Sequence, residues 1–317
     1  MSLAFVFPGQ GSQSVGMLDK LADTETIVRQ TLEEASTALG YDLWRLIHDG
    51  PAEALNETEK TQPAILTASV AAWRVWRDRG GPAPTVMAGH SLGEYSALVC
   101  ADSVGFAEAV DLVRYRGQAM QQAVPVGVGA MAAILGLEDE AVNDACAQAA
   151  KGQVLEAVNF NAPGQVVIAG HAEAVERGVQ LAKELGAKRA TPLPVSAPFH
   201  SSLMMPAAEA MRERLSDVCV RTTLVPEVYT VDAKTHTTPD AIRAALVAQL
   251  HEPVRWADTV RAMLAGGVDQ IVECGPGRVL SGLDKRIERS KELSHHTTGD
   301  LESIEAAIAS CWEKLNA

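Results

Sequence analysis

Basic side chains are scarce in this sequence. Its 317 residues include 27 lysines and arginines against 40 aspartates and glutamates, a formal net charge of −13 at pH 7. This balance argues against a nucleic-acid-binding protein, because phosphate backbones are bound mainly by Lys and Arg. An anionic ligand would have to meet a local basic patch rather than the field of the whole molecule.

Cysteines are few as well. The five cysteines are odd in number and scattered, and no C-x-x-C occurs. An odd, scattered set of cysteines without C-x-x-C is not typical of a disulfide framework or a zinc site, so neither is expected. We expect reduced thiols, no metal and a cytoplasmic protein.

Long apolar runs are also lacking. No stretch reaches membrane-spanning length without a charge or a turn, and residues 1–4 lead into a strand without a basic region before it. We therefore expect neither a membrane span nor a signal peptide. With 47% hydrophobic and 21% charged residues, the composition is that of a soluble globular protein with one large domain or two smaller ones.

Strand and helix patterns alternate along most of the chain, which predicts an α/β fold with a doubly wound parallel sheet. In the first part the patterns predict strands at 3–7 and 85–89 and helices near 20–39, 61–79, 93–101 and 106–123. In the last part they predict helices at 202–215, 239–249 and 303–315 and strands near 226–232 and 270–273. Residues 290–302 are expected to be the loosest connection.

The middle of the chain follows a different order. Strands at 131–135, 154–160, 165–169 and 189–193 and helices at 139–150 and 172–185 give βαββαβ, the ferredoxin-like unit. We therefore predict a small ferredoxin-like subdomain at 126–196, inserted into a large catalytic subdomain made of 1–125 and 197–317.

One motif stands at a strand-to-helix junction. Gly89–Gly93 reads G-H-S-L-G and lies between the predicted strand and helix, the context in which G-x-S-x-G forms a nucleophile elbow. Glycines are needed on both sides because a side chain would collide with the strand or the helix. The turn would raise the Ser91 hydroxyl at the positive end of the helix. The alternative is a tight connection in which Ser91 only caps the helix.

A serine nucleophile needs a neighbouring base, most often histidine. Of the eight histidines, His200 follows a proline-containing segment that leaves the small subdomain, and such a stiff segment could hold an imidazole over a cleft between the subdomains. The alternative is a histidine at the cap of the following helix.

Several segments together resemble the malonyl-CoA:acyl-carrier-protein transacylases of bacterial fatty-acid synthesis. The resemblance covers nearly the whole chain and is carried by Phe7–Gln13, Gly89–Glu94, Tyr115–Gly117, Asn159–Gln165, Pro198–His200 and Glu273–Gly277. It implies an α/β-hydrolase-like core with a ferredoxin-like insert, in agreement with the division above. It also implies transfer of a malonyl group from malonyl-CoA to the phosphopantetheine thiol of acyl carrier protein, with no cofactor.

The resemblance assigns roles to particular residues. Ser91 would attack the thioester, His200 would take its proton, and the backbone N–H groups of Gln10 and Leu92 would hold the oxyanion. The backbone carbonyl of Gln249 would orient His200. Asp232 is the alternative for that role, because hydrolase triads use an acid.

Arg116 is the predicted specificity residue, since a buried guanidinium would pair with the free carboxylate of a malonyl group. On the helix predicted at 106–123, Arg116 lies only slightly nearer the apolar face than Arg114 does. The choice of Arg116 therefore rests on the family motif Tyr115–Gly117. The other predicted substrate-binding residues are Phe199, Gln165 and Asn161. The alternatives are that Phe199 belongs to the ordinary core and that the segment containing Asn161 and Gln165 is a plain turn between strands.

Two basic pairs, Lys188–Arg189 and Lys285–Arg286, are candidates to meet an acidic carrier protein and the coenzyme phosphates. Three other functions stay open: a free-standing acyltransferase of polyketide synthesis, a serine esterase or thioesterase on the same elbow, and a non-catalytic carrier-binding module. The protein is expected to be a monomer.

Overall fold

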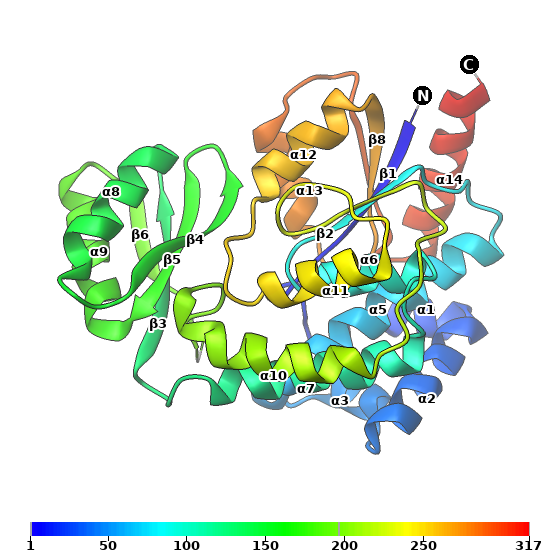
Figure 1. The fold of residues 1–317 in the computed structure, drawn as a ribbon. Coiled ribbons are helices and arrows are strands. Elements are labelled where there is room, and N and C mark those ends of the chain that lie inside the picture. The colour runs from blue at the N-terminus through cyan, green and yellow to red at the C-terminus, as the bar shows by residue number, and fades with distance from the viewer. Residues whose placement is uncertain (1, 196, 317) are drawn as a thin grey trace.

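The computed structural model describes residues 2–195 and 197–316. Two sheets organise the chain: a five-stranded sheet in the large part and a four-stranded sheet in the small part. Figure 1 shows the small sheet and its helices beside the large part, with both termini at the far end of the large part. Residue 196, the predicted end of the small subdomain, lies outside the described residues.

The five-stranded sheet is parallel throughout and has the order β7-β2-β1-β8-β9. Its strands are β1 (Ser2–Phe7), β2 (Val86–Gly89), β7 (Glu227–Tyr229), β8 (Val268–Glu273) and β9 (Ser294–Thr297). Successive side chains of a strand point to opposite faces. In β1, Leu3, Phe5 and Phe7 therefore join one core cluster, whereas Ala4 and Val6 join another on the opposite face.

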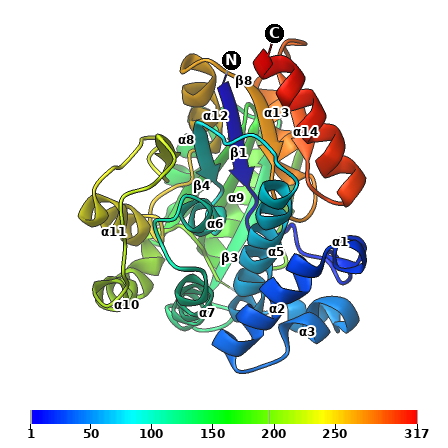
Figure 2. The same ribbon diagram turned by 90° about the vertical axis from the view of Figure 1, so that its right-hand side faces the viewer.

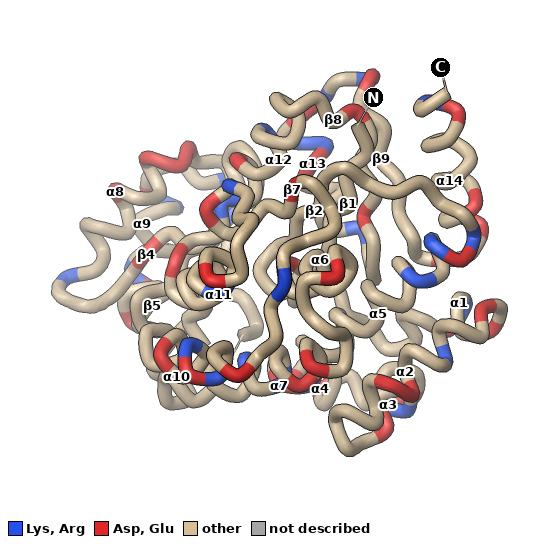
Figure 3. The backbone as a smooth tube through the Cα atoms, turned by 45° about the vertical axis from the view of Figure 1, so that its right-hand side comes forward, with Lys and Arg blue, Asp and Glu red and all other residues tan. Residues whose placement is uncertain are grey.

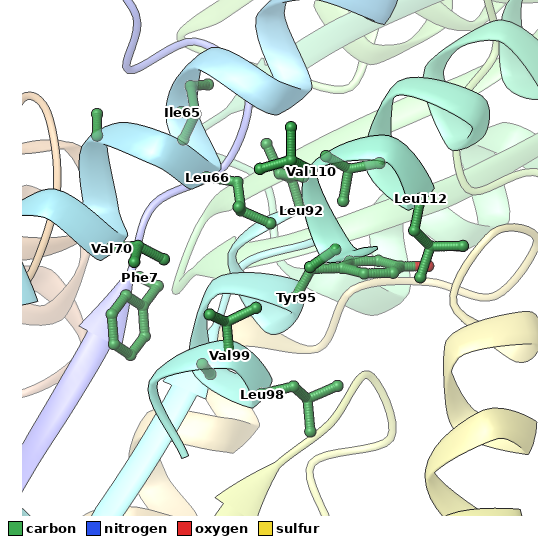
Figure 4. Close-up of a cluster of buried hydrophobic side chains, with 14 of the residues drawn as sticks. Phe7, Ile65, Leu66, Val70, Leu92, Tyr95, Leu98, Val99, Val110 and Leu112 are labelled. Atoms are coloured by element: carbon green, nitrogen blue, oxygen red, sulfur yellow. The ribbon is translucent and has the colours of Figure 1, made fainter. Parts of the chain in front are cut away.

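Helices cover both faces of this sheet, as expected for buried parallel strands. The larger cluster packs the sheet against α5 (Thr58–Asp78), α6 (Gly93–Cys100) and α7 (Phe106–Gln122), with α1 (Asp19–Thr24), α2 (Thr26–Leu39), α3 (Leu43–Asp49) and α4 (Ala52–Leu55) outside them. Figure 2 shows α1, α2 and α3 beside α5. In Figure 4, Leu92 and Tyr95 lie close to Leu66 of α5 and Val110 of α7.

The other face carries α12 (Trp256–Ala265) and α13 (Val279–Ile287). The sequence patterns above predict no element in either range. Their buried residues recur at helical spacing, Trp256, Val260 and Met263 in α12 and Leu280 and Leu283 in α13, so the signal was present. The last described element is α14 (Leu301–Asn316).

Three further boundaries differ from the predictions. The helix predicted at 20–39 is two helices, separated at Glu25, whose backbone is extended. The helix predicted from residue 61 begins at Thr58, so Pro63 lies inside it. The segment expected to be loosest contains β9, a strand whose sequence S-H-H-T has no apolar alternation and which pairs with β8 at the sheet edge.

The small part follows the predicted order: β3 (Gly129–Leu135), α8 (Asp139–Ala150), β4 (Leu155–Ala162), β5 (Gln165–His171), α9 (Ala172–Glu184) and β6 (Arg189–Pro192). The strands are antiparallel in the order β4-β5-β3-β6. One face packs on α8 and α9 in a core of its own, whereas Met131, Val167 and Ala169 join the core of the large part. The small sheet is thus fixed to the large part by apolar contacts.

After β6 the chain returns to the large part through α10 (Met205–Ser216), β7 and α11 (Pro239–Ala248). In Figure 1 these helices lie in front of the large sheet and close to its junction with the small one. No helix among the described residues is long and apolar enough to cross a membrane.

Candidate active site

Ser91 lies on a sharp turn between β2 and α6. Its φ of +52° is left-handed, a conformation that is strained for a residue with a side chain. A Cβ at Gly93 would come within 1.9 Å of the Phe7 carbonyl oxygen, and one at Gly89 within 1.9 Å of the Gly93 carbonyl carbon. The flanking glycines are therefore required by close packing of strand and helix, as the motif predicted.

The structure brings Ser91 and His200 together. The two residues are 109 positions apart, and Ser91 Oγ lies 2.8 Å from His200 Nε2. The second ring nitrogen, Nδ1, lies 2.8 Å from the backbone carbonyl oxygen of Gln249, at the end of α11. Because a carbonyl only accepts, Nδ1 carries the hydrogen and Nε2 is free to accept the Ser91 proton.

His200 is kept in its neutral form. It is buried, and burial lowers its pKa to about 3, with the nearby charge of Arg116 acting in the same direction. At neutral pH the imidazole is therefore unprotonated and can act as a base. Asp232, the alternative orienting acid, instead accepts from Thr230 Oγ1 at 2.8 Å and from the backbone N–H of Lys234 at 3.1 Å.

Two backbone N–H groups near Ser91 have no acceptor among the described residues, those of Gln10 and Leu92. Both residues line the cavity at Ser91. Gln10 lies in the loop after β1, and Leu92 precedes α6, so a strand end and a helix N-terminus supply the pair. Unpaired donors of this kind suit an oxygen that gains negative charge.

Arg116 is on the buried face of α7 and is 2% exposed. Its guanidinium donates to Gln62 Oε1 at 2.9 Å, to Gln249 Oε1 at 2.8 Å and to Ser91 Oγ at 3.2 Å. All three acceptors are neutral, and no carboxylate of the described residues forms an ion pair with this buried cation. Arg114 is instead half-buried and pairs with Asp111 on its own helix.

A cavity of about 190 Å³ opens at these residues, enough for a small acyl group. Its walls come from both parts of the chain: the apolar lining consists of Leu92, Met120, Met131, Val167, Leu193, Val195 and Phe199. The polar lining consists of Gln10, Gln62, His90, Ser91, Arg116, Asn159, Asn161 and His200.

The remaining predicted site residues divide into two groups. Phe199 and Asn161 line the cavity, and Asn161 Oδ1 lies 2.8 Å from His90 Nε2. Gln165 does not line it: its side-chain oxygen accepts from Arg286 at 2.5 Å, outside the cavity. Gln165 lies at the start of β5, beyond the part of β4 that faces Ser91, and its role in substrate binding stays a prediction.

The chain is similar to known proteins over almost its full length. The acyl transferase domain family matches residues 4–307. This chain belongs to that family. The malonyl CoA-acyl carrier protein transacylase of Escherichia coli K12 is 60% identical over 90% of this chain and 92% of its own, and that of Bacillus subtilis is 44% identical over 98% of both.

Solved structures agree with these relatives. The acyl-carrier-protein S-malonyltransferase of Burkholderia pseudomallei is 54% identical, with a TM-score of 0.95 over 98% of this chain and 100% of the other. A malonyl-transacylase solved in complex with its type II polyketide-synthase acyl carrier protein is 52% identical, also with a TM-score of 0.95, over 98% and 100%.

The site of this acyltransferase contains residues that the sequence analysis missed. The Gln249 side chain, in addition to its backbone carbonyl, donates to the Ser91 carbonyl oxygen at 3.0 Å and to Glu94 Oε2 at 2.6 Å. Gln62 comes from α5 and Asn159 from β4. Glu94 adjoins the elbow motif in sequence and could have been found there; Gln62 carries no sequence signal, because a glutamine on a buried helix face has no characteristic spacing.

Proposed function

We propose that this acyltransferase transfers the malonyl group of malonyl-CoA to the phosphopantetheine thiol of acyl carrier protein through a malonyl ester on Ser91. The observation that carries the proposal is the uncompensated Arg116 guanidinium 3.2 Å from the Ser91 hydroxyl. A buried cation at that place suits an acyl group that ends in a carboxylate. The relatives named as malonyl CoA-acyl carrier protein transacylases support the same assignment.

In the first half-reaction, Ser91 Oγ attacks the thioester carbonyl carbon and His200 Nε2 takes the serine proton. The N–H groups of Gln10 and Leu92 hold the oxyanion of the tetrahedral intermediate. When that intermediate collapses, His200 returns the proton to the departing sulfur, and coenzyme A leaves as the thiol. The steps need no metal and no cofactor.

In the second half-reaction the carrier thiol takes the place of coenzyme A. His200 removes the thiol proton, the sulfur attacks the ester, and Ser91 Oγ leaves as the hydroxyl after it regains a proton from His200. Neutral His200 is required at the start of both half-reactions, which is the state that burial enforces.

Carrier docking is proposed at one end of the small sheet. Leu135 pairs with both Gln165 and Arg189 across neighbouring strands, and Gln165 accepts from Arg286. Arg189 and Arg286 thus lie at the same end of the small sheet, and the side chains of both predicted basic pairs are exposed. Figure 3 shows acidic and basic segments interspersed over the outer helices, with basic residues on α13. This local patch suits an acidic protein partner despite the net charge of −13.

Kinetic patterns test the proposal. Because each half-reaction ends before the next substrate binds, initial rates measured against malonyl-CoA at several carrier concentrations should give parallel double-reciprocal lines. Ser91→Ala and His200→Ala should abolish transfer. Intersecting lines would indicate direct transfer between the two thiols and contradict the Ser91 intermediate.

We propose fatty-acid synthesis as the pathway, with polyketide synthesis as the second candidate because of the relative solved with a type II polyketide-synthase carrier. Comparing kcat/KM for the two kinds of carrier protein distinguishes them. The higher value should be that of the fatty-acid carrier.

For the architecture, we propose an α/β-hydrolase-like large subdomain with a ferredoxin-like insert at 126–196. The strand order β4-β5-β3-β6, with both helices on one face, supports the second part of this description. We also propose a cytoplasmic monomer. The five free cysteines are consistent with a reducing compartment.

A further inference from the structure

Glu94 is a buried acid that the proposed chemistry does not use. It lies on α6, three residues after the nucleophile, and is 1% exposed. The Gln249 carboxamide donates to its Oε2 at 2.6 Å, and its Oε1 has no partner among the described residues. No lysine or arginine of the described chain pairs with it.

The Gln249 carboxamide stands between Glu94 and Arg116. Its Nε2 faces Glu94 and the Ser91 carbonyl oxygen, and its Oε1 accepts from Arg116 at 2.8 Å. A flipped amide would set its oxygen against two other oxygens and its NH₂ group against the guanidinium. Because Glu94 Oε2 accepts from the amide, it stays an acceptor even when the acid is protonated on Oε1; Oε2 and the Ser91 carbonyl therefore fix the amide direction, which in turn orients Arg116.

We propose that Glu94 is a positioning residue for malonyl recognition: it holds the Gln249 carboxamide toward Arg116 without itself pairing with the guanidinium, whose charge is left to the substrate carboxylate. This inference rests on the proposed function. An ionised Glu94 would be a second anion close to Arg116 and would oppose the entry of the malonyl carboxylate, because two carboxylates sharing one site repel each other.

The groups around Glu94 favour the protonated form. Within the described part of the chain, Arg116 on α7 is the cation that acts on Glu94, and the acceptors of its hydrogen bonds are neutral. Asp232, after β7, adds a negative charge near Glu94. Tyr95, the next residue after Glu94, stays neutral because burial raises the pKa of its hydroxyl to about 12. Burial is the largest effect on Glu94 and raises its pKa to about 8, against smaller opposing effects of Gln249, Arg116 and the Val231 backbone.

A specific pH dependence follows. Above about pH 8 Glu94 loses its proton, so the KM for malonyl-CoA in the loading of Ser91 should rise about tenfold between pH 7 and pH 9. Acetyl-CoA carries the same coenzyme without the acyl carboxylate, so its KM should not share this rise. His200 does not titrate in this range, because its pKa lies near 3.

The experiment measures the KM for loading by both thioesters from about pH 6.5 to 9.5 in the wild type, Glu94→Gln and Asp232→Asn. Glutamine resembles the protonated acid, so Glu94→Gln should keep the malonyl KM of the wild type at pH 7 and lose the alkaline rise. Asp232→Asn removes a neighbouring negative charge, so its rise should begin at lower pH. A purely structural role of Glu94 predicts neither result.

Two outcomes would overturn the inference. One is a tenfold higher malonyl KM of folded Glu94→Gln at pH 7, which would show that the ionised carboxylate is needed. The other is an equal alkaline rise in the wild type and the variant. If wild-type protein does not load malonyl at pH 7, the proposed function itself fails; if it loads malonyl with a flat profile, only this inference fails.

A measurement that keeps Glu94 in place complements the variants. Calorimetric binding of malonyl-CoA to Ser91→Ala at pH 9, in two buffers with different protonation enthalpies, should show uptake of close to one proton. At pH 6.5 Glu94 is already protonated before the ligand binds, so binding should take up no proton through Glu94. Absence of proton uptake at pH 9 would overturn the inference even if Glu94→Gln failed to fold.

Discussion

At the scale of the residue, the central feature is a buried guanidinium without an ionic partner. Arg116 is surrounded by two side-chain amides and the nucleophile, and its Nε has no acceptor among the described residues. Such an arrangement is unfavourable until an anion arrives. The proposed function therefore predicts selectivity for malonyl over acetyl groups, since an acetyl group would leave the cation unpaired.

Arg116→Ala should lower kcat/KM for malonyl loading about 100-fold or more, because a buried charge pair with the substrate is lost. Loading with acetyl-CoA should persist or increase. Arg114→Ala, on the same helix but paired with Asp111, is the matched control and should load malonyl normally. Intact-protein mass spectrometry of both loading reactions checks this, and normal malonyl loading by Arg116→Ala would refute the carboxylate assignment.

At the scale of the element, the junction of β1, β2 and α6 has no room for a Cβ. Gly93→Ala would place a methyl group within 1.9 Å of the Phe7 carbonyl oxygen, so we expect a loss of several kcal/mol in stability or no folded protein. Gly282→Ala in α13 is the control, since nothing lies within 4 Å of the added Cβ, and helix propensity should stabilise it slightly. Thermal unfolding of the two variants distinguishes them.

Asp284 on α13 gives a pH-dependent prediction. It is fully buried, Trp256 Nε1 donates to it at 2.9 Å, and burial raises its pKa from 3.8 to about 8. The folded state therefore binds a proton that the unfolded state releases above pH 4. The resulting stabilisation is complete below that pH and is lost as pH rises toward 8.

Asp284→Asn keeps an acceptor for Trp256 and removes the titration. The variant should gain stability relative to the wild type as pH rises from 5 to 8, by about 1.4 kcal/mol per pH unit at most. Urea unfolding at several pH values measures this. A constant difference across the range would mean that Asp284 does not hold its proton in the folded state.

How much the sequence predicts depends on the strength of local patterns. The elbow at Gly89–Gly93 and the βαββαβ order were predictable, because glycine spacing and apolar periodicity are local signals. The edge strand β9 could not be predicted in this way, because its four residues are polar and form a strand only by pairing with β8. The side chain of Gln249 was missed for a related reason, because its contacts with Ser91, Glu94 and Arg116 arise only from the tertiary fold.

At the scale of the whole molecule, the cavity at Ser91 is formed by residues of both parts of the chain. Ser91 and Arg116 belong to the large part, and Met131, Asn161 and Val167 of the small part complete the cavity. The small sheet also presents Lys188 and Arg189 at the end where Arg286 contacts Gln165. One subdomain thus closes the acyl site and carries part of the proposed carrier-docking surface.

Charge reversal on this surface tests the docking proposal. Lys188→Glu with Arg189→Glu should raise the KM for carrier protein, because attraction to an acidic partner is lost, and the effect should diminish at high salt. The rate of malonyl loading on Ser91 should stay close to that of the wild type. An unchanged KM for carrier protein would place docking elsewhere.

The most direct test of the whole account is the mass of the intact protein after mixing with malonyl-CoA. We expect a single malonyl adduct on Ser91 that disappears when phosphopantetheinylated carrier protein is added, with the malonyl group recovered on the carrier. Carrier protein that becomes malonylated while no adduct forms on Ser91, or an adduct that water removes as fast as the carrier does, would contradict it.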